Sequence, residues 1–91
     1  MAEKHNTRID KWLWAVRIFK TRAQATEACA GGKVKIDGTA VKASRKIKPG
    51  ETLLVRKGVI KYMYKVLKIA EKRMGAKLII DFVEDLTPDD E

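Results

Sequence analysis

Residues 8–38 read RIDKWLWAVRIFKTRAQATEACAGGKVKIDG, and this stretch holds the clearest secondary-structure signals of the chain. Its first part spaces apolar residues at helical intervals, which predicts a helix with one buried stripe. The stripe consists of Ile9, Trp12, Leu13, Val16 and Phe19. We expect Thr7 to cap the start of this helix and Asp10 to lie in its first turn, where a carboxylate suits the helix dipole.

A second helix, rich in alanine, is expected from about Arg22 to Ala30. Thr21 can cap its start, and one glycine of Gly31-Gly32 can end it in a left-handed conformation. Its small residues allow close packing on the first helix. Cys29 is interpreted as a small buried hydrophobe.

The hydrophobic period changes from helical to two after the double glycine, which predicts strands. Asp37-Gly38 indicates a hairpin turn, and Pro49-Gly50 indicates a second turn. Alternation over residues 60–66 predicts a long half-exposed strand, and alternation over 78–83 predicts a last strand. We therefore expect an α+β fold, with two N-terminal helices packed on a small, mostly antiparallel sheet of about five strands.

The charge of the chain is basic overall and unevenly distributed. The formal net charge is +8 and the sequence pI is about 9.8. Residues 1–57 hold 14 Lys and Arg against 5 Asp and Glu, whereas residues 58–91 hold 6 against 7. The net charge is thus +9 in the first part and −1 in the second. This gradient favours a polyanionic partner that docks on the helical end.

The sequence lacks the residues of most enzyme and metal sites. Cys29 is the only cysteine and His5 the only histidine, so we expect no disulfide, no metal site and no cofactor. The carboxylates form no acid–base pair, and we expect no enzymatic activity. Residues 1–7 are polar, and no apolar run approaches the roughly 20 residues of a membrane span, so we expect a cytoplasmic protein without membrane contact.

Several strings in the chain resemble the ribosomal protein S4 domain, also called the alpha-L RNA-binding motif. They are RIDKWLW (8–14), Arg17, KTR (20–22), Ala25, GKV (32–34), Asp37-Gly38 and KAS (42–44). We expect one domain over residues 1–91, with a motif core at about 7–55 and with C-terminal strands and an acidic tail in 56–91. The strings DKWLW and KTR look closer to one branch, the bacterial ribosome-associated heat shock protein 15 family.

The resemblance implies a domain that presents its second helix and the following hairpin to structured RNA. In that branch it implies binding to large ribosomal subunits, especially those that still carry a nascent chain with transfer RNA. Asp37 stands where the family often has Asn, and both residues suit the turn. Longer family members carry a basic C-terminal extension, whereas this sequence ends in acidic residues, so a short relative in ribosome quality control or assembly is a close alternative.

The residues themselves agree with RNA binding. Lys and Arg supply charge and bidentate contacts for phosphate, and the start of the second helix favours anions. Gln24 could contact a base edge or a 2′-hydroxyl. The predicted RNA-binding residues are Arg8, Lys11, Lys20, Thr21, Arg22, Gln24, Lys33, Lys35, Lys42, Ser44, Arg45 and Lys46. We expect the protein to act as a monomer on large-subunit ribosomal RNA, with transfer RNA as a further partner.

Other functions fit the sequence less well. A DNA-binding helix-turn-helix needs long polar side chains on its recognition helix, and the second helix offers mainly alanine besides Gln24 and Glu27. A polypeptide-binding chaperone would need an apolar surface, and the predicted core leaves no large apolar stripe unused. Both remain alternatives to RNA binding.

Overall fold

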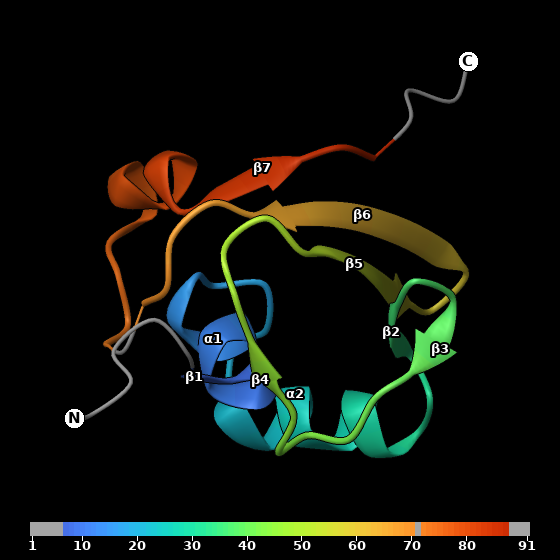
Figure 1. The fold of residues 1–91 in the computed structure, drawn as a ribbon. Helices are drawn as coiled ribbons and strands as arrows, with labels where there is room; N and C mark the ends of the chain where they lie inside the picture. The colour runs from blue at the N-terminus through green and yellow to red at the C-terminus, as the bar shows by residue number, and fades with distance from the viewer. Residues whose placement is uncertain (1–6, 71, 88–91) are drawn as a thin grey trace, which may run out of the picture.

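Two helices lie against the inner face of a curved antiparallel sheet (Figure 1). The computed structural model describes residues 7–70 and 72–87. The helices are α1 (Ile9–Ala15) and α2 (Arg22–Ala30). The sheet has the strand order β3-β2-β5-β6-β7, with bounds Thr39–Ala40, Val34–Ile36, Thr52–Lys57, Ile60–Val66 and Val83–Asp85. A separate short ladder joins β1 (Thr7–Arg8) to β4 (Lys46–Ile47). The predicted α+β class is confirmed.

The core lies between α1 and the concave face of the sheet. Trp12 and Leu13 of α1 are fully buried against strand residues such as Leu53 and Val55. The Trp12 indole Nε1 donates a hydrogen bond of 2.9 Å to the carbonyl oxygen of Lys68, so the first helix is tied to the segment that follows β6. Ile9, Trp12, Leu13 and Val16 of the predicted apolar stripe therefore form part of the core, whereas Phe19 is half-buried against it.

The first helix is shorter than the sequence predicts and begins differently. It ends at Ala15, and Arg17 then adopts a left-handed conformation with φ of 66°, which turns Phe19 out of the helix into a half-buried position. Thr7 does not cap the helix, because it pairs with Ile47 across β1 and β4. The first helical N–H groups instead donate to carbonyl oxygens of the 43–45 segment. These donors are consequently occupied by the chain itself.

The second helix and the hairpin after it match the sequence prediction. The Thr21 hydroxyl accepts a hydrogen bond of 3.1 Å from the Gln24 backbone N–H, and Gly32 beyond the helix has φ of 75°. Asp37 and Gly38 form the turn between β2 and β3, both with positive φ. Cys29 is buried, and burial together with the Asp10 charge raises the pKa of its thiol to about 11.

The C-terminal part differs from the prediction of one strand over residues 78–83. A 3-10 helix, η1, occupies Ala76–Asp81, and only Val83–Asp85 pair with β6. Ile79 and Phe82, three residues apart, contact the core, while Leu78 and Ile80 are exposed, so the buried residues of this segment follow the spacing of a helical turn and not the alternation of a strand. His5 and the acidic end at 89–91 lie outside the described residues. Within residues 7–70 and 72–87 no helix has the length and apolar character that a membrane crossing requires.

Candidate nucleic-acid interface

Asp10 holds two of the predicted RNA-binding arginines in place. Its carboxylate accepts hydrogen bonds of 3.2 and 3.0 Å from the Arg8 guanidinium and one of 2.9 Å from the Thr26 hydroxyl. The Arg22 guanidinium lies 3.6 Å from the same carboxylate. Asp10 is 1% exposed, whereas the arginine side chains are 46% exposed. We call Asp10, Arg8, Arg22 and Thr26 the Asp10 cluster.

The Asp10 carboxylate stays ionised in this setting. Burial by itself would raise the pKa of Asp10, but the hydrogen bonds from Arg8 and Thr26 and the charges of Arg8 and Arg22 outweigh it. The pKa of Asp10 therefore lies below its ordinary value. A carboxylate that is already paired in this way competes with RNA phosphate for the same guanidinium groups.

A third arginine of the predicted set is also engaged by an acid. Arg45 forms a two-pronged ion pair with Glu51, with nitrogen–oxygen distances of 3.3 and 2.9 Å. Burial would raise the pKa of Glu51, but Arg45 and the Lys48 backbone N–H, which donates a hydrogen bond of 2.8 Å, bring it below the ordinary value. This pair fixes the turn that leads into β5.

The predicted lysines and Gln24 are placed differently. A cleft of about 620 Å³ opens between α2 and the ends of β2 and β5, and Lys20, Gln24 and Lys33 line it. Three cations outside the predicted set line it too: Arg17, Arg56 and Lys57. Glu27 is the one carboxylate among the described residues that line the cleft. We call this the cationic cleft.

The cations of the cationic cleft differ from the arginines of the Asp10 cluster in their pairing with acids. Within residues 7–70 and 72–87, none of them lies at ion-pair distance from a carboxylate. Lys57 donates a hydrogen bond to the Ile18 carbonyl oxygen, its Nζ lies 4.9 Å from the centre of the Phe19 ring, and burial lowers its pKa. An anion that entered the cleft would offset this desolvation.

The remaining predicted residues lie around these two centres. Lys46 pairs with Arg8 across β1 and β4, and Lys42 lines a hollow beside the end of α2 with Cys29 and Val41. Lys11 is half-buried on α1 and Ser44 is exposed. The Thr21 hydroxyl caps α2, because it accepts a hydrogen bond from the Gln24 backbone N–H. Lys35 lies on the opposite face of the sheet from the helices, because its neighbours Val34 and Ile36 point into the core.

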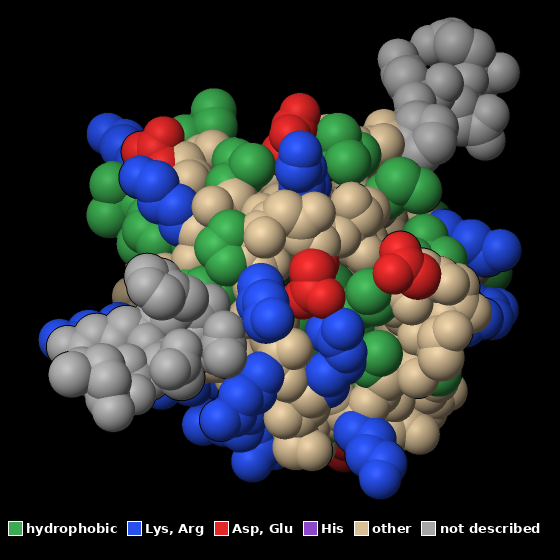
Figure 2. Space-filling model, viewed as in Figure 1, with side chains coloured by type: hydrophobic (Ala, Val, Ile, Leu, Met, Phe, Trp, Pro, Cys, Tyr) green, Lys and Arg blue, Asp and Glu red, His purple; other side chains and the backbone are tan. Residues whose placement is uncertain are grey.

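Figure 2 shows how these charges gather on one face. Several Lys and Arg side chains lie close together near α2 and β4, while the opposite end near η1 and β7 shows hydrophobic side chains interspersed with Lys, Arg, Asp and Glu. In this view the helical end therefore displays more basic side chains than the end near η1 and β7.

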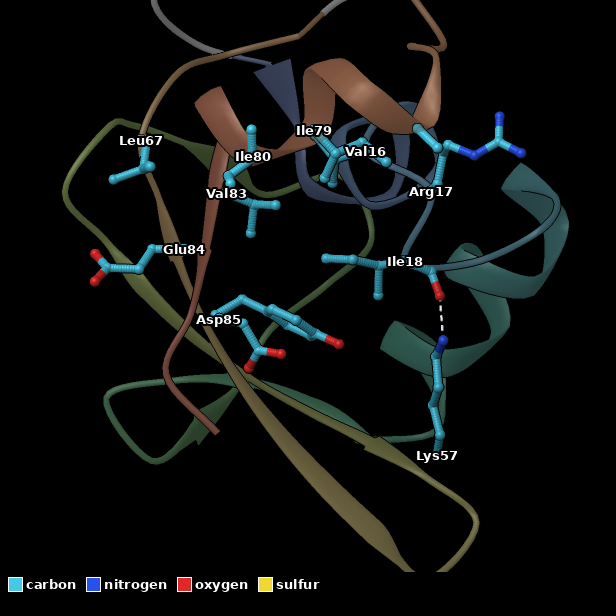
Figure 3. Close-up of a pocket in the computed structure, with 12 residues that line it drawn as sticks. Val16, Arg17, Ile18, Lys57, Leu67, Ile79, Ile80, Val83, Glu84 and Asp85 are labelled. Carbon is cyan, nitrogen blue, oxygen red and sulfur yellow. Dashed lines mark hydrogen bonds between the residues drawn. The ribbon is translucent and has the colours of Figure 1, made fainter. Parts of the chain in front are cut away.

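A second cleft of about 620 Å³ is mainly apolar and differs in kind. Val16, Ile18, Ile79 and Val83 line it, as Figure 3 shows, with Arg17 and Lys57 at one side and Glu84 and Asp85 at the other. Burial, with the charge of Asp85 and the neighbouring Tyr62, raises the pKa of Tyr64 in this cleft to about 12. Its mixed charge does not suit a polyanion.

Sequence reasoning missed Arg17, Arg56 and Lys57 in the cationic cleft. The helical spacing continues to Phe19 and so gives no sign of the left-handed backbone of Arg17. Arg56 and Lys57 directly follow the apolar run Leu53-Leu54-Val55. An antiparallel pairing of this run with β2, which the structure has, brings both residues to the cationic cleft, so the run was the signal that could have identified them.

Comparison with known proteins identifies the family. A model of the S4 domain family matches residues 7–53, which include α1, α2, β2 and the 41–48 segment. The chain belongs to the S4 domain family. Heat shock protein 15 of Escherichia coli K12 is 44% identical over 69 residues, which are 76% of this chain and 52% of the relative. An RQC P-site tRNA stabilizing factor of Helicobacter pylori is 40% identical over 57 residues, which are 60% of this chain and 68% of the relative.

The solved structures agree with the sequence matches. A trimeric structure of Vibrio cholerae heat shock protein 15 superimposes with a TM-score of 0.83 at 34% identity, covering 88% of this chain and 81% of the other. The expected resemblance to the S4 domain and to the heat shock protein 15 branch is confirmed. The chain spans about half the length of the curated heat shock protein 15 relatives it matches.

Proposed function

We propose that this S4 domain protein binds ribosomal RNA on the large ribosomal subunit and acts in the recycling or rescue of stalled subunits that carry a nascent chain. The cationic cleft carries this proposal. It places Lys20, Gln24 and Lys33 together with three further cations against one carboxylate. Structured RNA is the polyanion that such a cleft fits, since phosphates meet the cations and Gln24 can contact a base edge or a 2′-hydroxyl.

The names of the relatives support the ribosomal setting. One group is named heat shock protein 15, and the other is named for stabilising P-site transfer RNA in ribosome quality control. We infer that the partner includes large-subunit ribosomal RNA and transfer RNA held in stalled subunits. The role is binding rather than catalysis, and the protein acts in the cytoplasm.

A role in ribosome quality control is the second candidate within the same fold. The Helicobacter pylori factor favours it, because this chain covers 68% of that relative against about half of heat shock protein 15. The two roles share the large subunit and differ in whether transfer RNA must be present. A monomer remains our expectation, and the Vibrio cholerae relative is described as trimeric.

Sedimentation of purified ribosomal particles tests the proposal. The protein should travel with free large subunits and not with small subunits, and more of it should bind large subunits that retain peptidyl-tRNA. Dependence on transfer RNA would favour the quality-control role. An equal distribution between the two subunits, or absence from both, would overturn the proposal.

A further inference from the structure

The outer face of the sheet carries a cationic surface of its own. In the register of the sheet, Lys35 lies opposite Leu54, Leu54 lies opposite Met63, and Arg56 lies opposite Lys61. The alternate residues Leu53 and Val55 are fully buried on the inner face. Lys35, Arg56 and Lys61 therefore all lie on the side that faces away from α1 and α2, with Leu54 and Met63 beside them.

This outer surface is continuous with the cationic cleft. A hollow of about 110 Å³ is lined by Lys33, Lys35, Arg56 and Lys61 with Gly32 and Leu54, and it has no carboxylate among its described lining residues. Lys33 and Arg56 line this hollow and the cationic cleft alike. A strand of phosphates could consequently pass around these two residues from the helix side to the outer face.

One pair of residues in this arrangement works against the stability of the sheet. Arg56 and Lys61 stand directly opposite each other on β5 and β6, and like charges at such positions repel and destabilise a sheet. The Arg56 Nε–H donates a hydrogen bond of 3.1 Å to the Gly58 carbonyl oxygen. Among the described residues, no carboxylate lies at ion-pair distance from the Arg56 guanidinium. A bound polyanion would remove the repulsion.

We propose that the RNA-binding surface of this protein continues from the cationic cleft around Lys33 and Arg56 onto the outer face of the sheet, where Lys35 and Lys61 contact further phosphates of the same RNA. The inference rests on the proposed function. Leu54 and Met63, both half-buried beside the cations, offer an apolar surface for a ribose or a base. An acidic protein segment is the alternative occupant, and continuity with the cationic cleft favours RNA.

Protection of lysines from acetylation locates the surface directly. The protein is acetylated alone and in complex with protein-free RNA extracted from large ribosomal subunits, and the modified lysines are quantified by mass spectrometry. Lys35 and Lys61 should be protected several-fold together with Lys20 and Lys33, whereas exposed Lys72 and Lys77 should react equally in both samples. Protection of Lys20 and Lys33 without Lys35 and Lys61 would overturn this inference and leave the proposed function standing.

Two further outcomes separate the partners. Failure to protect any of the four lysines, on RNA and on intact large subunits, would overturn the inference and the proposed function together. Protection of Lys35 and Lys61 on intact subunits but not on the extracted RNA would assign the outer face to a ribosomal protein and overturn the inference alone.

Matched variants give an independent measurement. Lys35→Gln/Lys61→Gln and Lys72→Gln/Lys77→Gln each remove two positive charges. The first should flatten the slope of log affinity against log salt by roughly 1.5, and the second should change it much less. Equal slopes for the two variants would show binding through diffuse charge and overturn the outer-face assignment.

Arg56→Gln separates binding from folding. It should weaken RNA binding severalfold while changing the melting temperature little, because relief of the repulsion with Lys61 offsets the loss of the hydrogen bond to the Gly58 carbonyl oxygen. A lower melting temperature together with unchanged RNA affinity would mean that Arg56 serves the fold, and this would contradict the proposed path of the RNA.

Discussion

The Asp10 cluster and the cationic cleft use the same kind of side chain in opposite ways. In the cluster, Arg8 and Arg22 converge on a buried carboxylate within 3.6 Å or less. In the cleft, five cations share one carboxylate among the described lining residues, and none of them is ion-paired within the described part of the chain. The first arrangement links α1 to α2 within the fold, and the second leaves the cations without an acidic partner among the described residues.

The difference shows that a count of basic residues overstates the surface that is free to bind RNA. Arg8, Arg22 and Arg45 were all predicted to contact RNA, and all three are held by Asp10 or Glu51. Their half-exposed guanidinium groups can still meet phosphate, but each would have to share its donors with a carboxylate. Lys20 and Lys33 of the cationic cleft are in no ion pair within the described residues, so no carboxylate competes there with phosphate for their ammonium groups.

Trp12→Ala should have the largest effect, because it removes the frame on which both regions depend. Trp12 is fully buried and its indole binds the Lys68 carbonyl oxygen. The loss of packing should cost about 3–5 kcal/mol of unfolding free energy, measured by urea denaturation. Such a cost approaches the whole stability of a small domain. The control is Lys20→Ala in the cleft, which should cost far less, and the reverse order would contradict the assignment of core and surface.

Asp10→Ala should separate the two regions. It leaves the Arg8 and Arg22 guanidiniums without their buried partner, and the unfolding free energy should drop by about 1–3 kcal/mol. RNA affinity should be retained or increased, since both arginines become free. Asp81→Ala, which removes the same charge from an exposed site on η1, is the matched control and should leave stability nearly unchanged. Loss of RNA binding by the folded Asp10→Ala protein would show that the cluster itself builds the binding site.

The pH dependence of stability should originate in the acid-paired region. The pKa of Asp10 is lower in the folded protein than in the unfolded chain. Its stabilisation is therefore fully present above the unfolded value of about 3.9 and is lost as the pH drops through the folded pKa. Urea denaturation from about pH 6 to about pH 2 should show a smaller acid loss for Asp10→Asn than for the unmodified protein. Identical profiles would mean that Asp10 is not ionised in the fold.

The parts of the fold that depend only on neighbouring residues in the sequence could be predicted. Thr21, the double glycine and Asp37-Gly38 each impose a backbone conformation, and the structure has all three as expected. The prediction that Thr7 caps the first helix was wrong, because Thr7 pairs with Ile47 of β4, and no local sequence pattern reveals this pairing. The prediction of a strand over residues 78–83 was wrong, because Ile79 and Phe82 contact the core at a helical spacing, which competes with the alternation of apolar residues expected of a strand.

The candidate site was predictable in its residue types but not in its pairing. Charge and spacing predict the basic residues from Arg8 to Lys46 as RNA-binding, and this remains a prediction. Their division was not foreseeable, because it depends on Asp10 meeting Arg22 across α1 and α2, and on β5 placing Arg56 beside Lys33. Both contacts join residues that are far apart in the chain or on different elements.

The smallest expected effect distinguishes a paired cation from an unpaired one. Lys20→Ala removes a cation of the cleft and should flatten the slope of log RNA affinity against log salt by about 1. Arg22→Ala should flatten it by clearly less, because the Arg22 guanidinium is shared with Asp10 at 3.6 Å. If pairing with Asp10 is the cause, Arg22→Ala made in the Asp10→Ala protein should regain the full effect of about 1, while Lys20→Ala should have the same effect in both proteins. Salt titrations of the four single and double variants, with Asp10→Ala as reference, complete this cycle. An effect of Arg22→Ala that does not depend on Asp10 would mean that the carboxylate and the phosphate do not compete, and the contrast between the two regions would then rest on position alone.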